Sequence, residues 1–247
     1  MTDGQHGPDL EALDEDWQGA LAVVAHPDDL EYGSAAAVAR WTDQGKAVAY
    51  VLVTSGEAGI DGMRPEQARV VREEEQRRAA GIVGVEVVDF LGLPDGVLEY
   101  GVGLRRVIAA AVRRHRPEIV LTINFRDTWD GADVLNQADH IAVGRATLDA
   151  VRDAGNRWVF ADQIDSGLQP WDGVRAVWAG ASPSGRHGVD VTATFERGLE
   201  SLRAHEAYLT GLGAGQDPTE MLTQGARGVG ARLGCELGAP FEVFRVV

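Results

Sequence analysis

The sequence predicts a single α/β domain with a doubly wound, mostly parallel sheet of the Rossmann-like type. Short, continuous apolar runs are typical of strands covered on both faces, and they alternate with segments of helical periodicity through residue 155. The length of 247 residues fits one large domain. No repeat, low-complexity tract or linker divides the sequence. We therefore expect one domain over residues 18–247, preceded by a flexible, acidic lead-in over residues 1–17.

The first strand is expected over residues 20–25 ("ALAVVA") and the second over residues 46–54, with a helix over 34–45 between them. Gly45 is a stop signal for that helix. The next helix has Pro65 in its first turn and Gly84 at its end. Periodicity predicts helices over residues 65–84, 103–115, 140–155 and 193–213. It predicts further strands over residues 85–93, 118–124, 175–180 and 241–247.

Composition narrows the classes of partner and compartment. The net charge of −15 and the sequence pI of about 4.7 disfavour nucleic acid and anionic membrane surfaces, so we expect neither as a partner. A single cysteine, Cys235, leaves no internal disulfide and fits a reducing cytoplasm. The polar, acidic N-terminal residues are unlike a secretory signal, and the apolar runs are shorter than a membrane span. The expectation is a cytoplasmic protein, with a composition that suggests a GC-rich bacterial genome.

Four polar loops, each directly after a predicted strand, carry the most chemically active side chains. Their sequences are "HPDDLE", "SGEAGIDG", "LPDG" and "NFRDTWDGADVLNQADH". In open α/β sheets, ligands bind outside the carboxyl ends of the strands. We therefore expect these loops to meet at one edge of the sheet and to form the active site there.

The stretch "ALAVVAHPDDLEYGS", residues 20–34, ends a buried strand in His26, Asp28 and Asp29. Imidazole and carboxylate are good ligands for zinc, and a catalytic zinc takes three protein ligands and one water. We expect His26 and Asp29 to be two ligands and His140, at a loop-to-helix junction, to be the third. Asp28 could then take a proton from the bound water. Taken singly, paired acids are more often a turn or a helix cap, and a lone histidine a cap.

These residues resemble the PIG-L/LmbE-like family of zinc-dependent N-deacetylases. "AHPDDLEYG" resembles the family's "AHPDDE…G" signature, and "VREEEQRRAAGIVGVEVVDFLGLPDG" is similar to its "R..E...A...LGV….LPDG" segment. "RPEIVLTIN" followed by "NQADHIAVG" resembles the segment that ends in "HPDHR.VG". "GVDVTATFERGLESLRAHEAYL" resembles the "VDVS…K..A...H.SQ" segment. The resemblance runs along nearly the whole chain.

Residue by residue, the resemblance implies roles for several positions. The family's zinc ligands match His26, Asp29 and His140, and its general base matches Asp28. Asp139 matches the acid that precedes the last ligand and helps to orient a catalytic histidine. The resemblance thus implies Zn²⁺ as the cofactor and a metal-assisted hydrolysis as the reaction.

Three further positions match substrate contacts. Arg72 matches a helix-borne arginine, Asp95 matches a loop acid that reaches sugar hydroxyls, and His205 matches the histidine of the "AH.SQ" segment. For Arg72 the alternative is a solvated helix face rich in Glu and Arg. For His205 the alternative is a structural role.

Two departures from the family bear on mechanism. Gln137 stands where the family has the first histidine of "HPDH", which stabilises the oxyanion and protonates the leaving amine, and Ala138 replaces the proline. Glutamine donates an N–H but does not titrate. Either Asp28 carries both proton transfers, or another group such as His187 or His205 supplies the acid. Glu31, one residue later than in most members, could be a hydrogen-bond partner of His26.

The expected function is removal of an N-acetyl or similar N-acyl group from an amino sugar or related small metabolite. The alternative is a catalytically impaired protein that binds metal and sugar, because Gln137 replaces the histidine. Nucleotide binding is strongly disfavoured as a function. The sequence lacks both G-x-G-x-x-G after the first strand and G-x-x-x-x-G-K-[ST]. Homo-oligomerisation is possible through Trp158, Trp171 and Trp178, for which core packing is the alternative.

Overall fold

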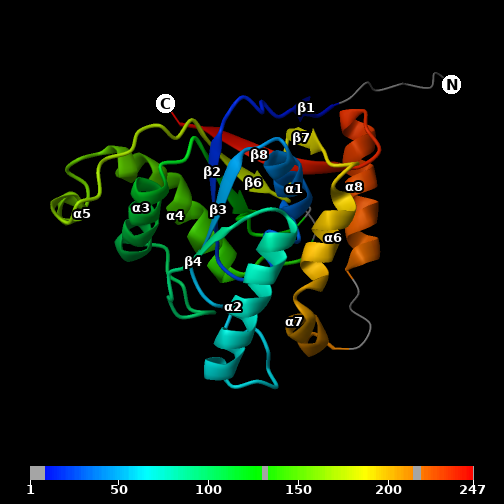
Figure 1. Cartoon of the computed structure of the whole chain (residues 1–247), viewed down its shortest axis with the longest axis horizontal. Coiled ribbons are helices and arrows are strands. Elements are labelled where there is room, and N and C mark those ends of the chain that lie inside the picture. Colours follow the sequence, from blue (N-terminus) through cyan, green and yellow to red (C-terminus); the bar gives the residue numbers. More distant parts are fainter. Residues whose placement is uncertain (1–8, 130–132, 214–217, 247) are drawn as a thin grey trace.

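A computed structural model describes residues 9–129, 133–213 and 218–246, and within them helices flank an eight-stranded sheet (Figure 1). The strands are β1 (Glu11–Ala12), β2 (Gly19–Val24), β3 (Ala47–Leu52), β4 (Val87–Phe90), β5 (Ile119–Ile123), β6 (Ala176–Gly180), β7 (His187–Asp190) and β8 (Gly238–Arg245). The helices are α1 (Ala35–Asp43), α2 (Pro65–Ile82), α3 (Val102–His115), α4 (Ala138–Gly155), α5 (Ala161–Asp165), α6 (Phe195–Arg203), α7 (Glu206–Gly211) and α8 (Thr219–Leu233).

The sheet has the order β1-β7-β8-β6-β5-β2-β3-β4 and is parallel except for β8, which runs antiparallel to both β6 and β7. This confirms the predicted doubly wound, mostly parallel architecture. From β2 the chain proceeds outward through β3 and β4, then returns to place β5 on the other side of β2. The strand order therefore reverses between β2 and β5, and a ligand site is expected outside the carboxyl ends of these two strands.

Two hydrophobic layers enclose β2 and explain its unbroken apolar run. Ala20, Ala22 and Val24 pack toward α1, whereas alternate residues of the same strand pack toward α3 and α4 on the opposite face. Figure 1 shows α3 and α4 on one side of the sheet and α1 and α6 on the other. A strand buried on both faces shows no alternation of polar and apolar residues.

The expectation of a flexible lead-in is wrong for residues 9–17, while residues 1–8 lie outside the described part of the chain. β1 pairs in parallel with β7. Trp17 is 1% exposed and packs edge-on against Trp41 and Trp178, with ring centroids 5.3 and 6.0 Å apart. Leu10, Leu13 and Trp17 are buried and hold this segment against the core, although most of its other residues are exposed.

The C-terminal third differs from the sequence-based expectation in three respects. The single helix expected over 193–213 is two helices, α6 and α7, with a break at Ala204 and His205. The sequence analysis missed β7 and α8. Three glycines, Gly225, Gly228 and Gly230, dilute the helical signal of α8.

The tryptophans considered for an interface have different environments. Trp178 is in the core at 3% exposure, whereas Trp158 is 81% exposed. Trp171 is partly buried, and its indole N–H donates to the carbonyl of Pro117. Within the described residues no helix is both long enough and apolar enough to cross a bilayer.

Candidate active site

The polar loops meet at the carboxyl edge of the sheet, as the strand order predicts. His26, Asp28 and Asp29 follow β2, Asp95 follows β4, and His140 lies in the first turn of α4 after β5. Together they line a cavity of about 840 Å³. The loop after β3 contributes Gly59 to the same cavity. Residues that are distant in the sequence are thus neighbours here because β2 and β5 are adjacent strands.

Three of these side chains present ligand atoms to one point. His140 Nε2 lies 2.9 Å from Asp29 Oδ1 and 3.2 Å from His26 Nδ1, and His26 Nδ1 lies 3.6 Å from Asp29 Oδ1. Ligand atoms at about 2.0–2.1 Å from a tetrahedral zinc are roughly 3.4 Å from one another. The three atoms fit three corners of such a tetrahedron. All three residues are buried.

Neighbouring groups hold each of these side chains from the side away from the shared point. His26 Nε2 lies 3.0 Å from Asp95 Oδ1 and 3.3 Å from Asp139 Oδ2. His140 Nδ1 lies 2.8 Å from Asn136 Oδ1. Asp29 Oδ2 accepts hydrogen bonds from the backbone N–H groups of Ala25 and His26. Metal-bound imidazoles characteristically donate their second N–H to an oxygen in this way.

The hydrogen-bond partners of the two histidines differ from the sequence-based expectation in two respects. Asn136 was not foreseen, although its place one helical turn before His140 is the available signal. Glu31 is not a partner of His26: its carboxylate instead accepts hydrogen bonds from Gln76 and Ser201. Asp95, in the loop after β4, and Asp139, in the first turn of α4, are the partners of His26 instead.

The cluster has an excess of buried negative charge. Burial opposes ionisation of Asp29, but His140 and His26 lower its pKa far below the ordinary value. Burial likewise opposes ionisation of Asp95 and Asp139, and hydrogen bonds, including those from His26, still lower both pKa values. Three carboxylates around two imidazoles favour a bound cation, because buried charge is costly unless it is compensated. The donor set therefore fits a divalent metal such as Zn²⁺.

Asp28 lies beside the cluster in an unusual backbone conformation. Its φ is 85°, and its N–H donates to Gln76 Oε1 at 2.9 Å. Its Oδ1 accepts from Arg72 Nη2 at 2.6 Å. Burial raises the pKa of Asp28 to about 6, although the Arg72 guanidinium lowers it. A carboxylate with a pKa near neutrality is suited to accept and return a proton.

Arg72 does not lie on a solvated helix face. Its guanidinium is buried and held by several contacts. It is 2% exposed and also donates to the carbonyls of Pro27 and Gly56, at 2.7 and 3.0 Å. Its guanidinium lies 4.1 Å from the ring centre of Tyr208. A Cβ on Gly59 would lie 2.3 Å from Arg72 Nη1, so the glycine-rich loop leaves the space that this side chain fills.

The remaining predicted residues take up distinct positions. Gln137 is exposed and lines the cavity. His205 is fully buried behind the wall, with its Nε2 3.7 Å from Glu31 Oε2. Burial lowers the pKa of His205, but the Glu31 carboxylate raises it above the ordinary value overall. His187, on β7, lies 3.5 Å from Glu11 and is not among the described residues that line the cavity.

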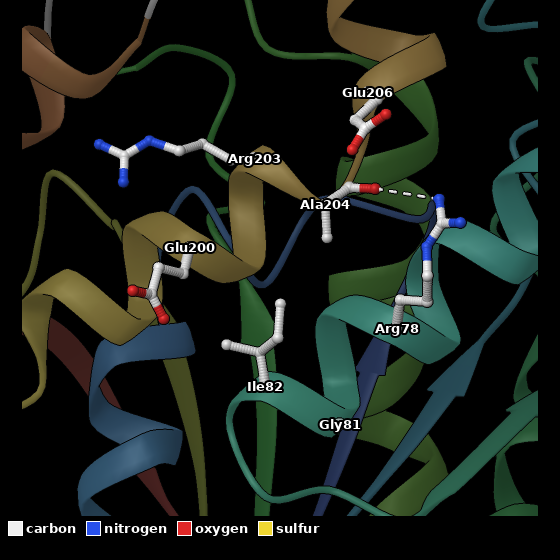
Figure 2. A pocket seen from close by; sticks show the side chains of 7 residues that line it. All are labelled: Arg78, Gly81, Ile82, Glu200, Arg203, Ala204 and Glu206. Carbon is white, nitrogen blue, oxygen red and sulfur yellow. Dashed lines mark hydrogen bonds between the residues drawn. The ribbon is translucent and has the colours of Figure 1, made fainter.

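The break between α6 and α7 turns His205 inward. Figure 2 shows Arg78 of α2 reaching the carbonyl of Ala204, to which its Nη2 donates at 3.5 Å. The surrounding hollow lies between α2 and the junction of α6 and α7, and it contains none of the predicted site residues. Its lining residues include Glu200, Arg203 and Glu206. The α2 contact therefore supports the kink, and the ligand cavity lies elsewhere.

Comparison with known proteins identifies relatives of this chain. The sequence profile described as "PIG-L: GlcNAc-PI de-N-acetylase" matches residues 21–151. Diacetylchitobiose deacetylase from Thermococcus kodakarensis is 30% identical over 194 residues, which are 78% of this chain and 70% of the relative. The structure is similar to N,N'-diacetylchitobiose deacetylase from Pyrococcus horikoshii, with a TM-score of 0.84 and 21% identity over 94% of this chain and 85% of that one.

A protein with a different named activity has the same fold. The 4-carboxy-2-hydroxymuconate hydratase from Pseudomonas putida matches with a TM-score of 0.72 and 20% identity, over 93% of this chain and 98% of that one. A shared fold alone therefore does not specify the reaction. The match of the family profile to more than half of the chain, together with the relative at 30% identity, identifies the family. The chain belongs to the GlcNAc-PI de-N-acetylase (PIG-L) family, whose members are N-deacetylases, and it is an enzyme of that type.

Proposed function

We propose that this protein is a zinc-dependent hydrolase that removes an N-acetyl or similar N-acyl group from an amino sugar or a related small metabolite. The observation that carries the proposal is the cluster of His26, Asp29 and His140, with Asp28 beside it in the same cavity. Diacetylchitobiose deacetylase acts, by its name, on an acetylated amino sugar, which supports this class of substrate.

His26, Asp29 and His140 would hold the zinc ion. When bound, zinc lowers the pKa of a water ligand to about 7 and polarises a carbonyl oxygen. Asp95, Asp139 and Asn136 keep the two imidazoles oriented through their outer nitrogens. The protein's own contribution to the metal site is therefore a fixed set of three donors.

Asp28 acts as the general base in this proposal. It accepts a proton from the attacking water, whose oxygen forms the new bond to the acyl carbon. The C–N bond then breaks, the acyl group leaves as a carboxylic acid, and the amine takes the proton that Asp28 held. Arg72 holds the Asp28 carboxylate in place throughout, through the 2.6 Å contact. The side-chain amide of Gln137 donates to the negative charge that develops on the acyl oxygen.

The test is zinc content and acetate release on the same samples of untagged protein. We expect about one zinc per chain in the wild type, by the three-ligand argument, with acetate released from N-acetylglucosamine derivatives. His26→Ala should lose both, whereas His187→Ala, a histidine outside the cavity, should keep both. Circular dichroism confirms that each variant is folded. A wild-type protein that takes up no zinc after reconstitution would contradict the proposal.

The second candidate is a catalytically impaired protein that binds metal and sugar. One observation favours it: Gln137, the residue in the place of the family's catalytic histidine, lines the cavity and has no titrating group. Stoichiometric zinc without turnover of any amide would support this alternative. Gln137→His is then the decisive variant, because restored hydrolysis would identify the missing proton donor.

A further inference from the structure

The cavity extends well beyond the cluster of His26, Asp29 and His140. Its other walls come from α6, α8 and the start of β8. In the sheet, β8 is separated from β2 by β6 and β5, so it lies about 14 Å away at the usual strand spacing. One continuous cavity thus joins the cluster to a region lined by α6 and α8.

This second region differs in chemistry from the first. We define the apolar arm by the residues Val191, Phe195, Leu199, Leu222, Ala226 and Val229. Every described residue that α6, α8 and β8 contribute to the cavity wall is apolar, a glycine or a proline. A sugar hydroxyl placed here would lose its hydrogen bonds to water without regaining them. The apolar arm therefore fits a hydrocarbon group and not a second sugar ring.

The size of the cavity gives an independent argument. An N-acetylated amino sugar has about 15 non-hydrogen atoms, which at roughly 30 Å³ each occupy at most about 450 Å³. The cavity measures about 840 Å³. About half of it remains free beside such a substrate, which is room for roughly a dozen further non-hydrogen atoms.

The sequence of α8 explains why the space is not filled by the protein. Leu222, Ala226 and Val229 follow the i, i+4, i+7 spacing of one helix face, which normally packs into a core. Here that face lines the cavity, and Ala226 and Gly230 are the only buried residues described for α8. The helix packs on β7 and β8, with Leu233 beside Gly188 and Val229 beside Gly238, while Leu222 and Ala226 also line the cavity.

We propose that the apolar arm binds an unbranched alkyl chain carried by the substrate. The chain belongs either to the N-acyl group or to an alkyl group on the glycosidic oxygen. This inference rests on the proposed function, because the cluster places the reacting amide at one end of the cavity. It deepens that function by assigning the enzyme to amphiphilic N-acyl amino sugars.

Two substrate series distinguish the two sources of the chain on zinc-loaded, full-length protein. One is a series of N-acyl glucosamines from acetyl to octanoyl, and the other is a series of alkyl N-acetylglucosaminides from methyl to octyl. Each methylene buried in the apolar arm should raise kcat/KM by up to about fourfold. A rise along either series supports the proposal and identifies the position of the chain. Values of kcat/KM that stay flat or fall along both series overturn it.

A matched pair of variants tests whether the effect arises in the apolar arm. A Cβ on Gly225 or on Gly228 meets nothing within 4 Å, and both residues belong to α8, but only Gly225 lines the cavity. Gly225→Phe should flatten the dependence of kcat/KM on chain length. Gly228→Phe should retain the wild-type dependence. Identical chain-length profiles in the two variants would contradict the assignment.

A binding measurement separates failure of the inference from failure of the proposed function. Methyl glucoside and hexyl glucoside contain no amide, so their affinities, measured by calorimetry on zinc-loaded protein, do not depend on hydrolysis. We expect hexyl glucoside to bind at least tenfold more tightly, and Gly225→Phe to reduce that ratio. Tighter binding of hexyl glucoside without hydrolysis of any amide would contradict the proposed function and still support alkyl binding in the apolar arm. Equal affinities of the two glucosides would contradict alkyl binding in the apolar arm.

Discussion

Gly144 of α4 is a position where a single added methyl group should disturb the proposed metal site. A Cβ there would lie 2.3 Å from Cβ and 2.5 Å from Cγ of Phe125. Ordinary carbon contacts are about 3.5–4.0 Å, so Gly144→Ala forces the helix and Phe125 apart by roughly 1 Å. Phe125 is 4% exposed and stacks on Phe244, which restricts its movement.

The expected change in the unfolding free energy of Gly144→Ala follows from two opposing effects. Overpacking a close contact destabilises the fold by about 1–3 kcal/mol, whereas Gly to Ala inside a helix stabilises by about 1 kcal/mol. Gly228→Ala in α8 has the same gain without the clash, because nothing lies within 4 Å of its Cβ. The difference in unfolding free energy between the two variants is therefore the overpacking cost, about 1–3 kcal/mol.

The functional consequence should appear in the affinity for zinc. His140 lies one helical turn before Gly144 on the same face of α4, and its Nε2 is 2.9 Å from Asp29 Oδ1. A helix displaced from Phe125 shifts that atom, so we expect Gly144→Ala to lower zinc affinity at least tenfold. Urea unfolding and competition with a chromophoric chelator measure the two effects. A Gly144→Ala protein that matches Gly228→Ala in both measurements would refute the reasoning.

Further predictions concern the groups around the site. Asn136→Ala should lower zinc affinity by about 10–100-fold, measured with metal buffers, because His140 loses the oxygen that orients it. Arg72→Met should cost about 3–5 kcal/mol in urea unfolding because it leaves buried Asp28 unpaired, whereas Arg77→Met, on an exposed part of the same helix, should cost under about 0.5 kcal/mol. Removing zinc with a chelator should lower Tm, and readdition should restore it, because a ligand that binds only the folded chain stabilises it. Glu31 raises the pKa of His205 despite burial, so the folded chain holds that proton more tightly. Stability should therefore fall as pH rises from about 6.5 through the folded pKa, and the decline should be shallower in His205→Gln, measured by thermal unfolding across that range.

Local sequence signals predicted the β2 strand and the edge of the sheet at which His26, Asp29 and His140 meet. These signals are short: an apolar run that ends in "HPDD" already specifies a strand and the polar loop after it. The partners of these residues could not be predicted in the same way. Asn136 is defined by its contact with His140, and Gln76 meets the Asp28 backbone across 48 positions of sequence. Such contacts depend on tertiary packing, which periodicity does not encode.

The helix α2 shows the physical reason most clearly. Arg72, Glu75 and Gln76 are buried together with Ala68 and Ala79, so one helix face combines polar and small residues. Hydrophobic periodicity assigns charged residues to the solvent side, which made a solvated face a reasonable interpretation of Arg72.

Burying charge is costly unless a partner compensates it, so this face is stable only against matching groups. Those groups are the Asp28 carboxylate opposite Arg72 and the Ala207 N–H opposite Glu75. Gln76 completes the match by linking the Asp28 backbone to Glu31. The polar face of α2 is therefore explained by the residue that it positions, Asp28, and by the chemistry proposed for that carboxylate.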